Sequence, residues 1–221
     1  MLPPATLPTS MREVLAAVRS AFTAPAFATL CALLTGTLTT AGPRTVTGMW
    51  QAAGLSERVH WGRAHRFVSH RMWDLDRVGL LLAHGLIDCF IAPGGALTVA
   101  VDDSLFPRYG KKIFGVAWQH DGSAKRRDGL GRGTCFVIAG FVLALPFMIR
   151  QVCLPVLFRL QVPKTGPSKV EQAPALVNLP AQAFPDRTIH LVADALYRGP
   201  AWPELPGKVT FTTRLASNAV L

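Results

Sequence analysis

Acidic residues are scarce in this sequence. Its 221 residues include 13 Asp and Glu against 23 Lys and Arg, which gives a formal net charge of +10 and a pI of about 10.2. Such an excess of positive charge attracts polyanions, with nucleic acid as the first candidate and an anionic membrane surface as the second. Half of the residues are hydrophobic, so the composition predicts a folded chain with one good core or two small domains.

Cysteine is also sparse, and its spacing excludes two kinds of framework. The four cysteines lie far apart and form no C-x-x-C pair, so neither a zinc knuckle nor a set of disulfides is indicated. A reducing cytoplasm is the simplest setting for them. Cys135 and Cys153 fall in apolar segments and are expected in the core.

The sequence lacks an uninterrupted apolar run long enough to cross a bilayer. Residues 21–43 carry no charge but are rich in Thr and broken by Pro25. Residues 133–149 contain Pro146 and fall short of the roughly 20 residues that a span needs. The first ten residues have no basic segment of the kind that begins a signal peptide. We therefore expect no membrane span.

Residues 1–92 are expected to form a helical region. Apolar residues recur at helical spacing over 11–40, with an interruption near Pro25, over 45–55 and over 76–90. Residues 58–77 interleave Arg and His with aromatic residues, a pattern that can place guanidinium groups on phosphates while the rings pack inward. Arg63 and Arg66 are the candidates for DNA contact. The alternative is a solvated basic face on a small helical domain.

After Pro93-Gly94-Gly95 the composition changes to a β-type pattern. The predicted strands are 98–101, 113–120, 135–145, 152–160, 188–193 and one around 209–212. A helix over 167–179 is predicted to have Ser168 as its N-cap. We expect residues 93–221 to form an α/β domain, in which helices flank a mixed sheet.

Three aspartates follow two of these strands. Asp102 and Asp103 come after 98–101, and Asp194 comes after 188–193. Successive strand residues face opposite sides, so we expect only one of the first two to act in a site; the alternative is a pair that caps a loop. A run of strands, followed by a helix and then by a further strand, matches the order of an RNase H-like core. Carboxylates from neighbouring strand ends can share Mg²⁺ and promote phosphoryl displacement.

Two basic loops are candidates for lining a channel along the DNA backbone. They contribute Lys111, Lys112, Lys125, Arg126 and Arg127. The alternative is that both are ordinary solvated loops. Near them, the pair His120-Asp121 is interpreted either as metal ligands or as a pair that anchors its loop.

Several sequence blocks occur in an order that carries more information than any single motif. They are R-T-V-T-G-M from Arg44, W-G-R-A-H-R-F-V-S from Trp61, V-D-D-S-L-F-P-R-Y-G-K-K from Val101, W-Q-H-D-G-S-A from Trp118, P-S-K-V-E from Pro167 and H-L-V-A-D-A-L-Y-R-G from His190. Together they resemble bacterial insertion-sequence transposases of the DDE superfamily. More narrowly, they resemble the DDE-endonuclease group whose first acid lies in a D-D-T block. The resemblance runs from about Met11 to the last residue.

The resemblance implies an RNase H-like catalytic domain behind a helical N-terminal region, which uses Mg²⁺ or Mn²⁺ to cut transposon ends and join them to target DNA. It places the first catalytic acid on Asp102, in a D-x-[ST] pattern with Ser104, or on Asp103. The second acid falls on Asp194, and the metal ligands would be Asp102 and Asp194. Ser104 replaces the more usual Thr and keeps the hydroxyl group.

The superfamily's third acid is a Glu well after the second Asp, often within a Y…R…E pattern. Glu204 is the one acid after Asp194 and lies in a turn. We therefore expect the N-terminal portion of a transposase, truncated and inactive in strand transfer on its own, so enzymatic activity is left open. The alternative is a non-catalytic DNA-binding remnant at transposon ends. Expected partners are terminal-repeat and target DNA, and a homodimer or a full-length transposase; the expected location is the bacterial cytoplasm, at the nucleoid.

Overall fold

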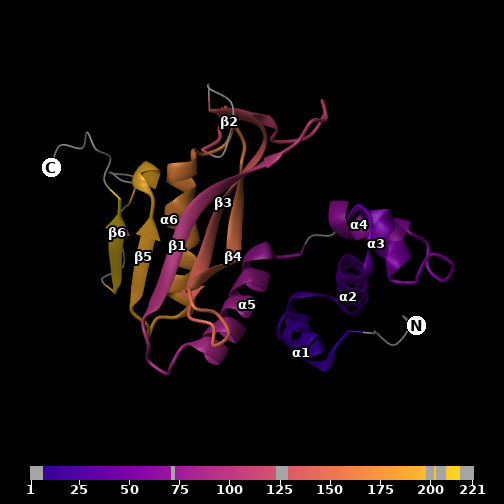
Figure 1. The fold of residues 1–221 in the computed structure, drawn as a ribbon, viewed down its shortest axis with the longest axis horizontal. Helices are drawn as coiled ribbons and strands as arrows, with labels where there is room; N and C mark the ends of the chain where they lie inside the picture. Colours follow the sequence, from indigo (N-terminus) through magenta and orange to yellow (C-terminus); the bar gives the residue numbers. More distant parts are fainter. Residues whose placement is uncertain (1–6, 71–72, 123–128, 198–201, 203–207, 215–221) are drawn as a thin grey trace. The chain divides into compact units, whose positions relative to one another are not determined.

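A computed structural model describes residues 7–70, 73–122, 129–197, 202 and 208–214 (Figure 1). The chain divides into two compact units, Met1–Gly85 and Leu86–Leu221. The boundary falls within helix α5 (Leu75–Phe90). No helix in the described part of the chain is long and apolar enough to cross a membrane.

The first unit is helical, as predicted. Its elements are α1 (Thr9–Ala17), the 3-10 turn η1 (Arg19–Ala21), α2 (Ala24–Thr39), α3 (Val46–Ala52), α4 (Gly62–Ser69) and the start of α5. The predicted interruption near Pro25 is the start of α2. Pro25 lies in its first turn, where a missing N–H breaks no helical hydrogen bond, and the Thr23 hydroxyl accepts from the Ala26 N–H at 3.4 Å.

The basic and aromatic segment 58–77 is not one helix. Within it, α4 ends at Ser69, and α5 begins at Leu75. The prediction that the aromatic rings pack inward holds only in part. Phe67 belongs to the core of this unit, and Trp73 packs against it with the ring centroids 5.8 Å apart, whereas Trp61 is 51% exposed and contacts His60 and His65. That core includes Trp50, which is 1% exposed and donates its indole N–H to the Val59 carbonyl at 2.8 Å.

The second unit contains an open mixed sheet, which confirms the predicted α/β class and is consistent with an RNase H-like fold. Its strands are β1 (Leu97–Pro107), β2 (Ala117–His120), β3 (Leu130–Leu143), β4 (Val152–Gln161), β5 (Ile189–Ala193) and β6 (Val209–Thr213). The order is β2-β3-β1-β5-β6, with β4 also paired to β3 (Figure 1). Strands β1, β5 and β6 run parallel, whereas β3 runs antiparallel to β1, β2 and β4.

Three of the predicted strands differ clearly in their bounds. The strand expected over 135–145 begins at Leu130, because β2 pairs with its first residues, and it ends at Leu143. The expected strand 98–101 continues to Pro107, because the long partner β3 pairs with it as far as Gly133. The expected strand 113–120 begins only at Ala117, since Gly115 turns the chain with a φ of +72°. Asp102 and Asp103 therefore lie within a strand rather than after its end.

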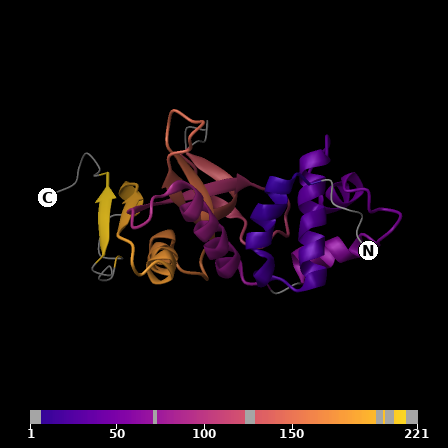
Figure 2. The same ribbon diagram turned by 90° about the horizontal axis from the view of Figure 1, so that it is seen from below.

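Helix α6 (Lys169–Ala183) covers one face of the sheet, where it contacts β1, β3 and β4 (Figure 2). The predicted N-cap is confirmed: the Ser168 hydroxyl accepts from the Glu171 N–H, and the Glu171 carboxylate accepts from the Ser168 N–H. The buried side of α6 includes Ala173, Leu176 and Val177, all 0% exposed. Burial of this apolar stripe holds the helix even though Pro174 and Pro180 interrupt its hydrogen bonds.

Candidate active site

Parallel pairing of β1 with β5 places two aspartates side by side. Val101 and Ala193 are the last paired residues, and Asp102 and Asp194 follow them directly. Among the described strands, none pairs with β1 on that side beyond Val101, so the sheet opens there. The opening is a cavity of about 760 Å³ whose lining includes Asp102, Asp103, Ser104, Gln119, His120, Asp121, Lys169 and Asp194.

Negative charge accumulates around Asp102. Its Oδ1 accepts from the Asp103 N–H at 2.8 Å, which fixes the orientation of the carboxylate. Burial raises the pKa of Asp102, the hydrogen bond from Asp103 opposes that shift, and the charges of Asp103 and Asp194 raise the pKa further. The negative charges of these carboxylates therefore repel one another, and a bound cation would relieve this repulsion.

Asp194 is oriented by the turn that follows β5. Its Oδ1 accepts from the Leu196 N–H at 2.8 Å, at the start of the 3-10 turn η2 (Ala195–Tyr197). The Thr213 hydroxyl, at the end of β6, donates to the Asp194 carbonyl at 2.8 Å. One hydrogen bond thus holds the carboxylate of this residue, and another holds its backbone.

Asp103 faces the opposite side of β1, as the strand alternation predicts, and lies beneath the start of α6. Its Oδ2 accepts from the Lys169 ammonium at 2.5 Å and from the Cys135 thiol at 3.3 Å. Its Oδ1 accepts from the Tyr197 hydroxyl at 3.4 Å. Both carboxylate oxygens therefore have donors, and Asp103 is an internal counter-ion rather than an open ligand.

The same network shifts the pKa values of its donors. Burial lowers the pKa of Lys169, but the hydrogen bond and the charge of Asp103 outweigh it and the pKa is raised. Burial is the main cause that raises the pKa of Cys135 to about 11. Burial also raises the pKa of Tyr197, which is 0% exposed. The network thus holds a charged lysine and a neutral thiol and phenol around one carboxylate at neutral pH.

Sequence reasoning missed Lys169, Cys135 and Tyr197 as partners of Asp103. Cys135 is buried as predicted, but it also donates a hydrogen bond. The same prediction for Cys153 was wrong, because this residue is exposed on β4. A signal for Lys169 was available, because a cation in the first turn of a helix is unfavourable unless an acid lies nearby.

The predicted DNA contacts are distributed over both units. The Arg63 guanidinium is used within the first unit, where it donates to the Thr29 hydroxyl and the Pro25 carbonyl, each at 2.9 Å. Arg66 is exposed on α4. Lys125, Arg126 and Arg127 lie outside the described residues.

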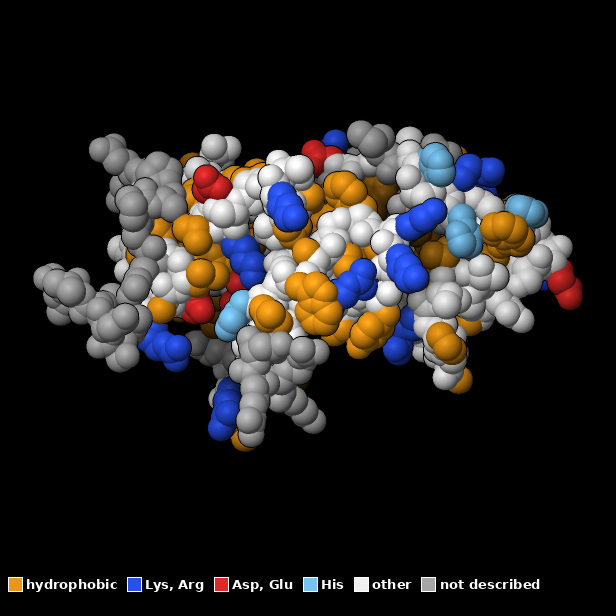
Figure 3. Space-filling view, turned by 90° about the horizontal axis from the view of Figure 1, so that it is seen from above, with side chains coloured by type: hydrophobic (Ala, Val, Ile, Leu, Met, Phe, Trp, Pro, Cys, Tyr) orange, Lys and Arg blue, Asp and Glu red, His pale blue; other side chains and the backbone are white. Residues whose placement is uncertain are grey.

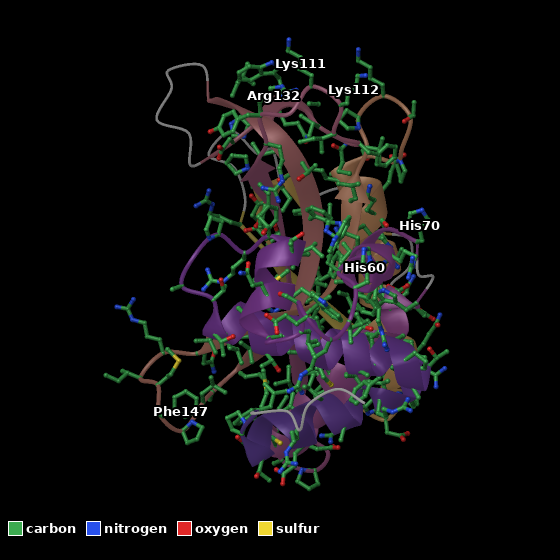
Figure 4. The ribbon with its side chains drawn as sticks, turned by 90° about the vertical axis from the view of Figure 1, so that its right-hand side faces the viewer. His60, His70, Lys111, Lys112, Arg132 and Phe147 are labelled. Atoms are coloured by element: carbon green, nitrogen blue, oxygen red, sulfur yellow. The ribbon has the colours of Figure 1, made fainter. Side chains whose placement is uncertain are left out.

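In the second unit, Lys111 and Lys112 are exposed in the segment between β1 and β2. Arg132 lies at the same end of the unit (Figure 4) and donates to the carbonyls of Arg108 and Gly110. On the face shown in Figure 3, Lys and Arg side chains lie among hydrophobic ones.

Carboxylate oxygens are the ligands that Mg²⁺ and Mn²⁺ prefer, and the donor chemistry of Asp102 and Asp194 fits such an ion. Their shared cavity and mutual repulsion also fit a cation. Within the described ranges, no group of three His, Cys, Asp or Glu side chains is placed to hold a metal.

The Asp121 N–H donates to the Gly129 carbonyl at 2.8 Å, which ties together the two ends of the β2–β3 loop.

A mixed sheet with two carboxylates at the paired ends of neighbouring strands is typical of nucleases that act with divalent metal ions. Comparison with known protein families supports this class. Residues 17–221 match the family described as DDE superfamily endonuclease, and the chain belongs to this family. Membership implies DNA binding and confirms the predicted resemblance at the level of the superfamily. A comparison with curated proteins found no match.

Proposed function

We propose that this chain is the DNA-cutting part of a transposase, which acts with the help of Mg²⁺ or Mn²⁺ and does not transfer strands on its own. The observation that carries the proposal is the position of Asp102 and Asp194, which follow the last paired residues of β1 and β5 and line one cavity in a DDE superfamily endonuclease. Asp102 and Asp194 are the proposed metal ligands.

The residues around these acids have distinct tasks in this proposal. Asp102 and Asp194 would hold divalent ions, which would supply the positive charge needed to activate the attacking oxygen and to stabilise the leaving oxygen of a phosphodiester. The Asp103 and Leu196 N–H groups orient the two ligands. Lys169 neutralises Asp103, so that the strand does not add another uncompensated charge to the cavity. The positive net charge attracts the DNA backbone.

A second candidate function is binding to transposon ends without cleavage. The observation that favours it is that no third His, Cys, Asp or Glu joins Asp102 and Asp194 in a metal-binding group among the residues with a described position. Two carboxylates hold a divalent ion less firmly than three, because they attract it with less negative charge. In this second function, the basic surface binds DNA and no phosphodiester is cut.

Mg²⁺-dependent nicking of terminal-repeat DNA distinguishes the two functions. We expect nicking by the full chain, its loss in Asp102→Asn and in Asp194→Asn, and salt-sensitive DNA binding that both variants retain. A rise in melting temperature with Mn²⁺ alone, absent in both variants, is a readout that does not depend on activity. Binding without nicking in the unmodified chain supports the second candidate. A metal response unchanged in both variants contradicts the proposed ligands.

The finer parts of the proposal rest on the sequence resemblance. They are an insertion-sequence origin, a chain that is the front part of a longer transposase, association with itself or with a full-length transposase, and a place at the bacterial nucleoid. The nucleotide sequence after the codon for Leu221, translated in all three frames, tests the second of these through a Y…R…E segment.

A further inference from the structure

Three phenylalanines form a row across the face of the sheet opposite α6. They are Phe106 on β1, Phe136 on β3 and Phe158 on β4. The ring centroids are 5.6 Å apart for the first pair and 5.9 Å apart for the second, with interplanar angles of 80° and 76°. Such nearly perpendicular contacts are favourable for aromatic rings, so the row is stable as it stands. Yet Phe106 is 41% exposed and Phe158 is 40% exposed.

The row lines a groove of about 280 Å³, which we call the aromatic groove. Its lining is Phe106, Arg108, Phe136, Ile138, Pro155 and Phe158. The volume lies near the lower end of the roughly 300–1,000 Å³ that small-molecule sites occupy, so the groove suits one small, flat group. Its floor is apolar, and its one charged residue is an arginine.

The aromatic groove continues from the proposed metal site on the same face of the sheet. Asp102, Ser104 and Phe106 alternate along β1 and share that face. Ile138 pairs directly with Asp102, and Phe136 pairs with Ser104. Phe106 lies four residues beyond Asp102, which is about 13 Å along a strand. This spacing corresponds to roughly four base steps of DNA at about 3.4 Å each.

We propose that the aromatic groove binds an unstacked nucleobase of the DNA strand that the chain holds at Asp102 and Asp194. This inference rests on the proposed DNA function and names a second contact for the same substrate. Aromatic side chains beside a positively charged surface are the usual way in which proteins bind single-stranded nucleic acid, because every base has a π-face. Arg108 supplies the charge within the groove, and Lys111 and Lys112 follow it in the same segment.

Charge favours a nucleic acid over a protein as the occupant. The groove contains no acidic side chain among its lining residues, and the chain carries a net charge of +10. The groove also opens beside the cavity that the proposed function assigns to DNA, so one strand can reach both. In this arrangement, the base leaves the helical stack a few nucleotides from the phosphodiester at Asp102, and the strand is held in place for cutting.

The test uses the full chain with oligonucleotides that carry the fluorescent base 2-aminopurine at single positions, in single-stranded, mismatched and paired forms. We expect the fluorescence of 2-aminopurine to be quenched at one position of the oligonucleotide, a few nucleotides from the phosphodiester that is cut. Phe158→Ala is expected to weaken single-strand binding about 5- to 150-fold and to abolish this quenching, while duplex binding stays within about twofold. Phe158→Leu keeps most of the apolar volume without the ring, and it should lose the quenching as well.

Phe147→Ala is the matched control. Phe147 is 77% exposed and lies between β3 and β4, at the end of the second unit opposite Lys111 and Lys112 (Figure 4). We expect this variant to bind and quench like the unmodified chain. Unchanged quenching in both Phe158 variants overturns the proposal, and so does self-association of the unmodified chain that Phe158→Ala abolishes without an effect on DNA. Asp102→Asn separates the two proposals, because it should lose nicking and keep the quenching.

Discussion

Replacing Lys169 with Met should destabilise the second unit through Asp103. The side chains of both residues are 18% exposed, so the ion pair lies between a surface pair, worth about 0–1 kcal/mol, and a fully buried one, whose disruption costs about 3–5 kcal/mol. Met keeps the aliphatic stem but leaves the Asp103 carboxylate to the weaker donors Cys135 and Tyr197. We expect a loss of about 2–3 kcal/mol in the free energy of unfolding.

Urea unfolding of the full chain measures this loss, and hydrogen exchange at the amides of β1 and α6 assigns it to the second unit. Asp103→Asn and the double variant complete a mutant cycle, and we expect a coupling energy of about 1–2 kcal/mol. Lys112→Met, at an exposed loop position, is the control and should change stability by less than about 0.5 kcal/mol. Strictly additive effects of the two substitutions would refute the reasoning.

The remaining predictions concern stability. Gly36→Ala should cost about 3 kcal/mol or more, because an added Cβ would overlap the Met49 carbonyl, whereas Gly85→Ala meets open space within a helix and should gain about 0.5–1 kcal/mol; thermal unfolding compares the two. Ser168→Ala removes the cap of α6 and should cost about 1 kcal/mol in urea unfolding, and an unchanged midpoint would contradict this. Hydrogen bonds at Ser168 lower the pKa of Glu171, so its stabilising contribution is present above about pH 4.5 and is lost as the pH falls through the lowered value. Glu171→Gln should therefore show a flatter stability profile between pH 5 and pH 3, measured by urea unfolding at each pH.

Local signals predicted the elements that build the site. Ser168 was predicted as the N-cap of α6, and the structure confirms it and shows that Glu171 completes a capping box there. The apolar run before Asp194 predicted β5 to within one residue. Alternation along β1 placed Asp102 and Asp103 on opposite faces, as the structure has them. Each of these features depends on neighbours in the sequence.

Features set by distant segments were not predictable in the same way. β1 continues past Val101 because β3 pairs with it, although the apolar pattern of β1 itself fades there. Asp103 and Lys169 meet because α6 packs across the sheet, and no spacing rule links two residues so far apart. Lys169 in the first turn of its helix indicated that some acid lies nearby, but that this acid is Asp103 follows from the folded arrangement.

The parallel pairing of β1 with β5 also bears on the order of events during synthesis. Asp102 leaves the ribosome long before Asp194, and the strands between them can form antiparallel hairpins at once. Closing β5 against β1 is a contact of high sequence separation, which forms late because the loop entropy must be overcome first. A nascent chain with β1, β3 and β4 in place consequently has only one of the two proposed metal ligands, so the proposed site is incomplete until translation has passed Asp194.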